Sequence, residues 1–319
     1  MLNRPPPGRT PAVSSSSRST PERMLARKET EPVRSAVAAD LGLTAVKLKP
    51  AEFDQIRRLA HQQFGLDLKK GKEELVSARL GKMMRRHGFT SFGSYYEHVV
   101  ADRSGEALIE MIDALTTNHT SFLREPAHFE FLENAVRVDF NGGPVRIWSA
   151  ACSTGEEPYS IAFHLVNAGV APSSARILAT DISTRALDKA RRGLYQAERL
   201  DHMPQHWGRR FLLQGEGEWK GWYKIKPEIA GMIEFRRLNL MEAFRGSEMF
   251  DVIFCRNVMM YFDRETQGDL VRRLAARLEP GGYFFIGHSE SLNGFDHPLT
   301  YCRPATYRKG AARRGKGPA

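Results

Sequence analysis

The segment at residues 145–165, VRIWSAACSTGEEPYSIAFHL, combines small residues with an acidic pair where a ligand could bind. An apolar run is followed by small residues from Ser149 to Gly155 and then by apolar residues at helical spacing, which predicts a strand, a tight turn and a helix. Small residues let a ligand approach the backbone, and a helix start offers unpaired N–H groups. An ordinary strand-to-helix connection gives the same pattern, so this segment alone leaves both interpretations open.

A third acidic residue follows the next predicted strand. The run ARILATD at 175–181 ends in Asp181, which comes 26 positions after Gly155. Nucleotide-binding folds present a carboxylate to ribose hydroxyls at this point, the carboxyl end of the second strand. We therefore predict that Asp181 binds a ribose.

The acidic pair Glu156 and Glu157 argues against a dinucleotide. The phosphate fingerprint G-x-G-x-x-G is absent, and the two carboxylates would repel a pyrophosphate. An adenosine ligand with a cationic sulfonium and an amino group suits this charge, so we predict S-adenosylmethionine as the cofactor. Acidic residues in a first helical turn also complement the helix dipole, and this alternative stays open, for Glu156 more than for Glu157.

Composition limits the class of protein. The chain has 319 residues, 41% of them apolar, which is enough for two domains. No apolar run approaches the ~18 residues of a membrane span, and the N-terminus lacks the apolar core of a signal peptide. We expect a cytoplasmic protein without membrane insertion. The three cysteines, Cys152, Cys255 and Cys302, lack metal-ligand spacing, so we expect small buried residues and no metal site.

The net charge of +10 lies mainly at the two ends of the chain. Residues 1–40 carry +3 and residues 303–319 carry +6, which leaves +1 for the rest. A nearly neutral core gives no reason to expect a nucleic-acid partner. A nucleic-acid methyltransferase, suggested by the basic ends, and a non-catalytic scaffold that binds the cofactor remain alternative functions.

The sequence divides into parts of different composition. Proline, serine and arginine dominate the N-terminal segment, which predicts disorder, whereas later segments show helical periodicity and then alternating strands and helices. Continuous apolar strands predict a mostly parallel sheet covered on both faces. The predicted parts are a disordered basic tail at 1–44, a helical domain at 45–115, a linker contributing to the cofactor site at 116–140, an α/β domain at 141–308 with a β-hairpin inserted at about 209–234, and a basic tail at 309–319.

The predicted helix from Lys72 to His87 has a basic face beside an apolar stripe. At 100° per residue, four cations fall within an arc of roughly 80°. They are Lys72, Arg79, Lys82 and Arg86. A solvated surface is the usual role of such a face, but four cations without interleaved acids favour an acidic partner. We therefore predict that they bind substrate.

Several segments in the same order resemble the chemotaxis receptor methyltransferases, the CheR family of S-adenosylmethionine-dependent protein-glutamate O-methyltransferases. The segments that carry the resemblance are 114–125 (ALTTNHTSFLRE), 148–160 (WSAACSTGEEPYS), 179–181 (ATD), 239–240 (NL), 254–263 (FCRNVMMYFD) and 287–290 (GHSE). The resemblance covers about residues 48–308. It implies a Rossmann-like methyltransferase domain with an inserted small β subdomain, preceded by a small all-helical domain.

The resemblance also implies roles for individual residues. Asn118, Thr120 and Arg124 would contact the cofactor, with Arg124 pairing the methionine carboxylate. Glu157 would bind the amino group and Asp181 the ribose. The remaining cofactor contacts would be Asn239, Leu240, Arg256 and Asn257. Arg256 and Tyr261 would also orient the acceptor carboxylate; in the alternative, Arg256 only shapes the cofactor pocket and Tyr261 only packs.

The resemblance implies a reaction and partners as well. The reaction is O-methylation of glutamate side chains on chemoreceptors, which forms methyl esters during adaptation of the chemotaxis signal. The substrate would be the acidic helical bundle of the receptor's cytoplasmic region. In some members the β subdomain also binds a C-terminal receptor peptide as an added strand, and the glycines of Gly215-x-Gly217-x-x-x-Gly221 resemble those members.

Overall fold

A computed structural model describes residues 46–116, 120–140 and 144–310. The tails predicted at 1–44 and 309–319 lie outside these residues, except for Lys309 and Gly310. Within the described ranges, no helix has both the length and the apolar character needed to cross a membrane.

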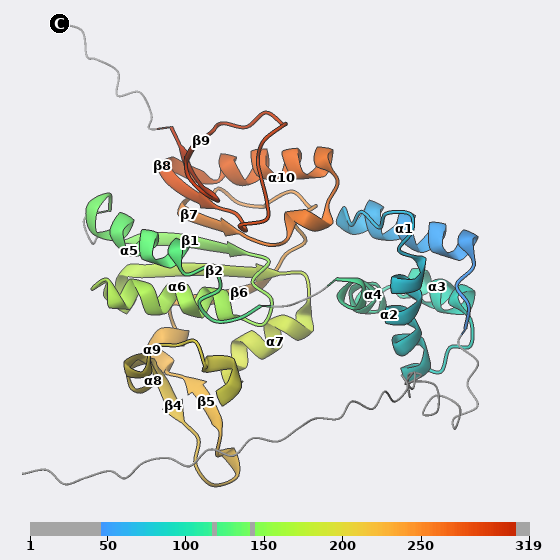
Figure 1. The fold of residues 1–319 in the computed structure, drawn as a ribbon, viewed down its shortest axis with the longest axis horizontal. Helices are drawn as coiled ribbons and strands as arrows, with labels where there is room; N and C mark the ends of the chain where they lie inside the picture. The colour runs from blue at the N-terminus through green and yellow to red at the C-terminus, as the bar shows by residue number, and fades with distance from the viewer. Residues whose placement is uncertain (1–45, 117–119, 141–143, 311–319) are drawn as a thin grey trace, which may run out of the picture. The chain divides into compact units, whose positions relative to one another are not determined.

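The first part of the described chain is helical (Figure 1). Its helices are α1 (Pro50–Phe64), α2 (Glu73–Arg86), α3 (Phe92–Ala101) and α4 (Glu106–Leu115). Each contributes apolar residues at helical spacing to one core, including Ile56, Leu80, Tyr95 and Ile112, all of which are buried. These amphipathic faces explain why four short helices form a folded unit.

The second part is built on a seven-stranded sheet with the order β6-β2-β1-β7-β8-β10-β9. The strands are β1 (Val145–Ala150), β2 (Ala175–Asp181), β6 (Ile233–Arg237), β7 (Phe250–Cys255), β8 (Leu278–Phe285), β9 (Leu299–Arg303) and β10 (Thr306–Lys309). Strands β6, β2, β1, β7 and β8 are parallel, and β10 is antiparallel to both of its neighbours. The predicted mostly parallel sheet is confirmed.

Helices cover both faces of this sheet (Figure 1). One face packs against α5 (Ala127–Val138) and α6 (Glu156–Asn167), with Ile147 and Phe254 in the shared core. The opposite face packs against α10 (Arg264–Ala276), with Trp148 and Ile253 in its core. Alternate residues of β1 therefore enter different cores, as the two-residue period of a strand requires. Helix α7 (Thr184–Arg192) follows β2, and the short 3-10 segments Pro172–Ser174 and Met259–Tyr261 lie in connections.

A small antiparallel sheet is inserted between α7 and β6. Its strands are β3 (Leu194–Gln196), β4 (Leu212–Gln214) and β5 (Trp222–Ile225), in the order β3-β5-β4. The short helical segments among them are Ala197–Leu200, α8 (Gln205–Phe211), Gly217–Trp219 and α9 (Pro227–Ala230). The predicted hairpin corresponds to β4 and β5. A Cβ at Gly215 would lie 2.2 Å from the carbonyl oxygen of Trp219, so the connection between these strands requires glycine there.

The structure adds elements that the sequence analysis did not describe. Helix α5 occupies part of the predicted linker at 116–140, although its buried residues Phe129, Leu132 and Val136 do have helical spacing. Strand β3 has only three residues, too few to show a period. The expectation that all three cysteines are buried is wrong for Cys302, which is exposed on β9, whereas Cys152 and Cys255 are buried.

Candidate active site

The order of the strands determines where a ligand can bind. From β1 the chain proceeds to β2 and β6 on one side, and it then returns to β7 and β8 on the other. In open α/β sheets a crevice forms at such a switch point, outside the carboxyl ends of the strands. The predicted site residues Asp181 and Arg256 lie there, at the end of β2 and just after β7.

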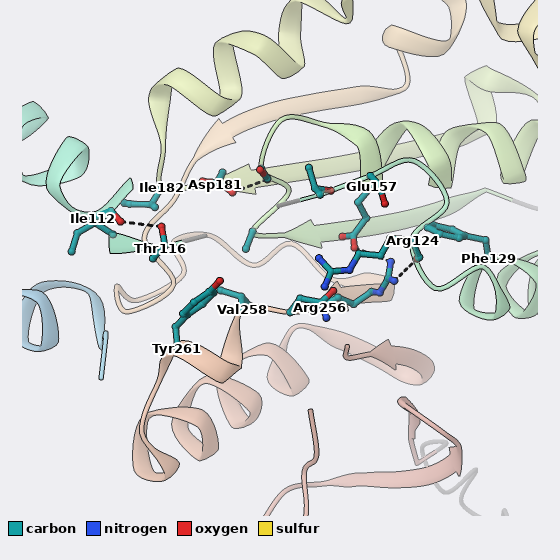
Figure 2. Close-up of a pocket in the computed structure, with 15 residues that line it drawn as sticks. Ile112, Thr116, Arg124, Phe129, Glu157, Asp181, Ile182, Arg256, Val258 and Tyr261 are labelled. Carbon is teal, nitrogen blue, oxygen red and sulfur yellow. Dashed lines mark hydrogen bonds and ion pairs between the residues drawn. The ribbon is translucent and has the colours of Figure 1, made fainter. Parts of the chain in front are cut away.

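A cleft of about 780 Å³, including space open to solvent, lies at this switch point (Figure 2). Of the predicted site residues, it is lined by Thr120, Arg124, Glu157, Asp181, Arg256, Asn257 and Tyr261. A second hollow of about 520 Å³ shares Asp181 and Tyr261 with the cleft and is also lined by Asn239 and Leu240. The fold thus brings nine predicted residues together from five segments of the chain. Asn118, the remaining predicted cofactor contact, lies outside the described residues.

The turn after β1 forms the floor of the cleft. Ala151 and Ser153 have φ values of 65° and 49°, and Gly155 has a φ of 97°. A Cβ at Gly155 would lie 2.8 Å from the Cβ of Ala190 on α7. The start of helix α6 can therefore lie this close to α7 only with glycine at position 155. The backbone N–H of Ser153 points toward β2 and donates to Asp181. The turn therefore positions a carboxylate as well as making room.

Backbone amides hold Asp181 at the end of β2. Its Oδ2 accepts a hydrogen bond of 2.7 Å from the N–H of Ser153, and its Oδ1 accepts one of 2.9 Å from the N–H of Ser183. Burial raises the pKa of Asp181 to about 6, and these hydrogen bonds oppose the rise. Each carboxylate oxygen has a second lone pair that can accept from a ligand. This geometry suits the binding of ribose hydroxyls.

Glu157 and Glu156 have different environments although they are neighbours in the sequence. Glu157 lines the cleft, where its Oε1 accepts 2.7 Å from the hydroxyl of Ser149. Burial raises the pKa of Glu157, and the Arg256 guanidinium opposes this. Glu156 is fully buried, pairs with Arg199 and accepts 2.7 Å from the hydroxyl of Thr154. Only Glu157 is therefore placed to contact a ligand.

Arg256 lies between two carboxylates, those of Glu125 and Glu157, in the wall of the cleft. Its side chain is 1% exposed, with Nη1 3.1 Å from Glu157 Oε2 and Nη2 3.0 Å from Glu125 Oε2. Nη2 also donates to the carbonyl oxygen of Arg124. A guanidinium held at both ends is not free to turn toward an acceptor carboxylate. This geometry favours the interpretation that Arg256 shapes the cofactor pocket.

Two glutamates that were given no role in the sequence analysis position the predicted residues. Glu125 pairs with Arg256, and its Oε1 accepts 3.3 Å from Nδ2 of Asn257. Glu290 Oε2 accepts from the backbone N–H groups of Asn257 and Gly287 at 2.9 and 2.7 Å. Glu290 therefore fixes the connection from β7 to Tyr261. Both glutamates are in segments that carry the family resemblance, 114–125 and 287–290, and that was the available signal.

Backbone conformation marks the same region. Six described residues other than glycine have positive φ, and Ala305 is the one in the turn between β9 and β10. The others surround the cleft: Leu123, Glu125, Ala151, Ser153 and Asn257. Such conformations cost about 1–3 kcal/mol each and cluster where binding or chemistry requires them. Their grouping independently indicates a functional site.

The helical part of the chain forms one side of the cleft. Ile112 and Thr116, at the end of α4, line both hollows. Tyr261 also lines both and packs against the core of the helical part, while its carbonyl oxygen accepts 2.8 Å from the N–H of Asp67. The predicted basic residues Lys72, Arg79, Lys82 and Arg86 are on α2 or at its N-cap and line neither hollow.

The cleft has the features that a S-adenosylmethionine site requires. It contains two carboxylates, at Glu157 and Asp181, for an amino group and a ribose, and an arginine, Arg124, for a carboxylate. The buried hydroxyl of Ser153 has no hydrogen-bond partner in the part of the chain that the structure describes. A buried polar group of this kind in a cleft of several hundred Å³ points to a ligand.

Comparison with known proteins decides the family. A family profile described as "CheR methyltransferase, SAM binding domain" matches residues 118–307, and one described as "CheR methyltransferase, all-alpha domain" matches residues 51–116. The chain belongs to the CheR methyltransferase family. The resemblance inferred from the sequence is confirmed, and this CheR chain is a S-adenosylmethionine-dependent methyltransferase.

Curated relatives cover most of the CheR chain. "Chemotaxis protein methyltransferase 2" of Pseudomonas aeruginosa is 43% identical over 249 residues, which are 77% of this chain and 88% of the relative. The "Chemotaxis protein methyltransferase" of Salmonella typhimurium is 40% identical over 248 residues, 77% of this chain and 85% of the relative. The "Chemotaxis protein methyltransferase" of Escherichia coli is 38% identical over 255 residues, which are 79% of this chain and 88% of the relative.

Proposed function

We propose that this chain is a protein-glutamate O-methyltransferase that esterifies glutamate side chains in the cytoplasmic region of chemoreceptors and acts in the cytoplasm. The observation that carries the proposal is the cleft that brings Glu157 and Asp181 together with Tyr261 at the switch point of a CheR-family sheet. The names of the relatives, all chemotaxis protein methyltransferases, support a receptor substrate.

The cofactor, when bound, supplies the methyl group, and the residues of the chain bind and orient. Asp181 accepts hydrogen bonds from the ribose hydroxyls, Glu157 binds the amino group, and Arg124 pairs with the carboxylate. Asn257, held by Glu125 and Glu290, completes the wall. Arg256 offsets one of the two buried negative charges of Glu125 and Glu157.

The acceptor needs no general base. A glutamate with a pKa of about 4.3 is already ionised at neutral pH. Its carboxylate oxygen is therefore nucleophilic before it binds to the enzyme. Catalysis then depends on alignment and on removal of water from the acceptor. Tyr261, which lines both hollows, is the residue that we propose to orient the acceptor carboxylate.

The chemical nature of the product tests this function. The full chain is incubated with methyl-labelled S-adenosylmethionine and a chemoreceptor fragment that contains the cytoplasmic helices. We expect label on the receptor that mild base releases as methanol, and no label with Asp181→Ala. Label on nucleic acid, or label on protein that resists base, would contradict the proposal. Cofactor binding without any labelled receptor would support the scaffold alternative.

The basic face of α2 is proposed as the surface that meets the receptor, but its four cations are not equivalent. Arg79 donates to the carbonyl oxygen of Leu115 at the end of α4, and Arg86 lies 3.7 Å from Glu110. Lys72 and Lys82 are exposed. We therefore assign receptor recognition mainly to Lys72 and Lys82. Arg79 instead stabilises the end of α4, which lines the cleft.

The inserted β subdomain is proposed to bind the receptor's C-terminal peptide. In the sheet order β3-β5-β4, strand β4 pairs only with β5 among the described strands, so one edge of β4 is available for a further strand. Leu213 on β4 and Trp219 nearby are 47% and 53% exposed, large apolar side chains that a bound peptide would cover.

A further inference from the structure

Three side chains of metal-ligand type meet beside the cofactor cleft. They are Glu125, just before α5, His128, in its first turn, and His288, just after β8. One ligand atom from each lies within 4.8 Å of the other two. Glu125 holds Arg256 and Asn257 in the cofactor pocket, whereas neither histidine was assigned a role in binding the cofactor or the receptor. The three cysteines lack metal-ligand spacing, which predicted no metal site, but this cluster contains no cysteine.

His128 is the unusual member of this cluster. It is 1% exposed, and neither ring nitrogen has a hydrogen-bond partner among the described residues. The nearest acidic atom, Glu125 Oε2, is 3.5 Å from His128 Nδ1, and the His288 ring packs edge-on with its centroid 4.8 Å away. Leaving a buried polar group unsatisfied is unfavourable, because the group loses its hydrogen bonds to water and gains none in the protein. A ligand that bonds to this imidazole would recover that free energy.

We propose that Glu125, His128 and His288 form a Zn²⁺ site. Two imidazoles and one carboxylate are a ligand set that zinc accepts while keeping a position open for water. Zinc-to-ligand distances of 2.0–2.2 Å place ligand atoms about 3.4 Å apart in a tetrahedral site. The most distant ligand atoms must therefore approach by up to about 1.4 Å, and the exposed His288 can make this movement and admit the ion.

Zinc would compete with the cofactor pocket for Glu125. The Oε2 of Glu125 lies 3.0 Å from Arg256 Nη2, and its Oε1 accepts from Asn257 and from the N–H of His288. Coordination would draw this carboxylate away from Arg256, whose own positive charge opposes the ion. Zinc binding and an ordered cofactor pocket are thus antagonistic. By linkage, each ligand weakens the other by the same factor.

Binding of Zn²⁺ alone tests the site. The full chain, stripped of metal with a chelator, is titrated with Zn²⁺ in competition with a chromophoric chelator. We expect one equivalent of bound Zn²⁺ in the parent and an affinity at least about tenfold lower in His288→Ala, which removes an exposed ligand. The control His206→Ala removes an exposed histidine in the first turn of α8 and should behave as the parent does. Glu125→Gln provides a second ligand variant.

Cofactor affinity tests the antagonism. We expect added Zn²⁺ to weaken S-adenosylhomocysteine binding by about fivefold or more in the parent and in His206→Ala, but not in His288→Ala. If the parent binds no Zn²⁺, or if His288→Ala and Glu125→Gln bind it as the parent does, the site is overturned. If Zn²⁺ binds through His288 and S-adenosylhomocysteine affinity stays the same, the competition for Glu125 is overturned.

Discussion

Asp181 shows how burial couples the cofactor site to pH. Its pKa of about 6 lies above the usual aspartate value because the carboxylate is buried, while the hydrogen bonds that we propose with the ribose are strongest to the ionised form. The sign follows directly: as the pH falls through 6, Asp181 takes up a proton and loses acceptor capacity. As the pH is lowered through 6, cofactor affinity should therefore decrease, although an ordinary aspartate would still be ionised at that pH.

We predict that S-adenosylhomocysteine binds the parent about tenfold more weakly at pH 5 than at pH 7.5, since about one tenth of the sites are then ionised. Asp181→Asn should bind weakly at pH 7.5, and the ratio of its dissociation constant to that of the parent should shrink at pH 5. The pKa of Glu157 is also raised, but protonation of Glu157 affects the parent and Asp181→Asn alike. The ratio of the two dissociation constants therefore reports the titration of Asp181 alone.

Calorimetric titration at the two pH values measures this ratio. Asp188→Asn, an exposed change of the same type on α7, serves as the control and should follow the parent. A ratio that is the same at both pH values would show that Asp181 does not titrate in this range.

Helix α2 illustrates that charges at similar positions on one element can have different roles. Arg79 is half-buried and bound to the end of α4, whereas Lys72 and Lys82 are exposed. Exposed charges chiefly change the encounter rate and its salt dependence, while the cofactor pocket does not include them.

We predict that Lys72→Glu combined with Lys82→Glu slows receptor methylation about tenfold at low salt, because an acidic receptor surface would meet reversed charge. S-adenosylhomocysteine affinity should stay at the parent value. Added salt should slow the parent and affect the double variant less, since screening weakens both attraction and repulsion.

Initial methylation rates over a salt series provide the measurement. Reversal of Lys189 and Arg192 on α7 changes the net charge by the same amount on another exposed surface and should have little effect. If the α2 variant methylates receptor normally at low salt, this face is solvated surface and the receptor docks elsewhere.

Strand β4 gives a second prediction at the scale of one element. Leu213→Lys combined with Trp219→Ala should weaken binding of a chemoreceptor's C-terminal peptide by about tenfold or more, because the bound peptide would lose apolar cover. Fluorescence anisotropy with a labelled peptide and the full chain measures this. Gln196→Lys, on the opposite edge strand β3, is the control. Equal peptide affinity in the parent and in the β4 variant would remove this edge from receptor binding.

At the scale of the molecule, the chemistry is expected to reside in the described residues. The tails at 1–44 and 309–319 contribute +7 of the net charge of +10 and show no apolar period. The predicted boundary at 308 nevertheless falls inside β10, which runs to Lys309. The Nζ of Lys309 donates to the carbonyl oxygens of Ala275 and Leu278 at 2.8 and 2.6 Å.

We predict that a chain of residues 45–310 folds and methylates receptor at nearly the parent rate. A chain of residues 45–308 should be less stable by about 1–3 kcal/mol, because it lacks the hydrogen bonds of Lys309. Chemical denaturation of the two shortened chains measures their free energies of unfolding. Methylation rates at equal enzyme concentration compare their turnover with that of the parent. A large loss of turnover by the 45–310 chain would show that a tail completes the site.

The sequence by itself determined the elements whose signals are local. The strand, turn and helix at 145–165 follow from hydrophobic period and small residues, and Asp181 follows from the end of the next strand. The sequence distinguished the roles of Glu157 and Glu156 only in part. Acidic residues in a first helical turn can stabilise the helix dipole as well as bind a ligand. Strand β3, with three residues, gave no periodic signal at all.

The tertiary structure decided how the site residues hold one another. Arg256 contacts Glu157 across 99 positions and Glu125 across 131, and Arg79 reaches the end of α4 across 36. Such pairs depend on the strand order, which places the ends of β1, β2 and β7 together, and on the packing of α2 against α4. Periodicity along the chain carries no information about which distant charges meet. For this reason the sequence predicted nine residues that line the two hollows, and the fold determined their partners.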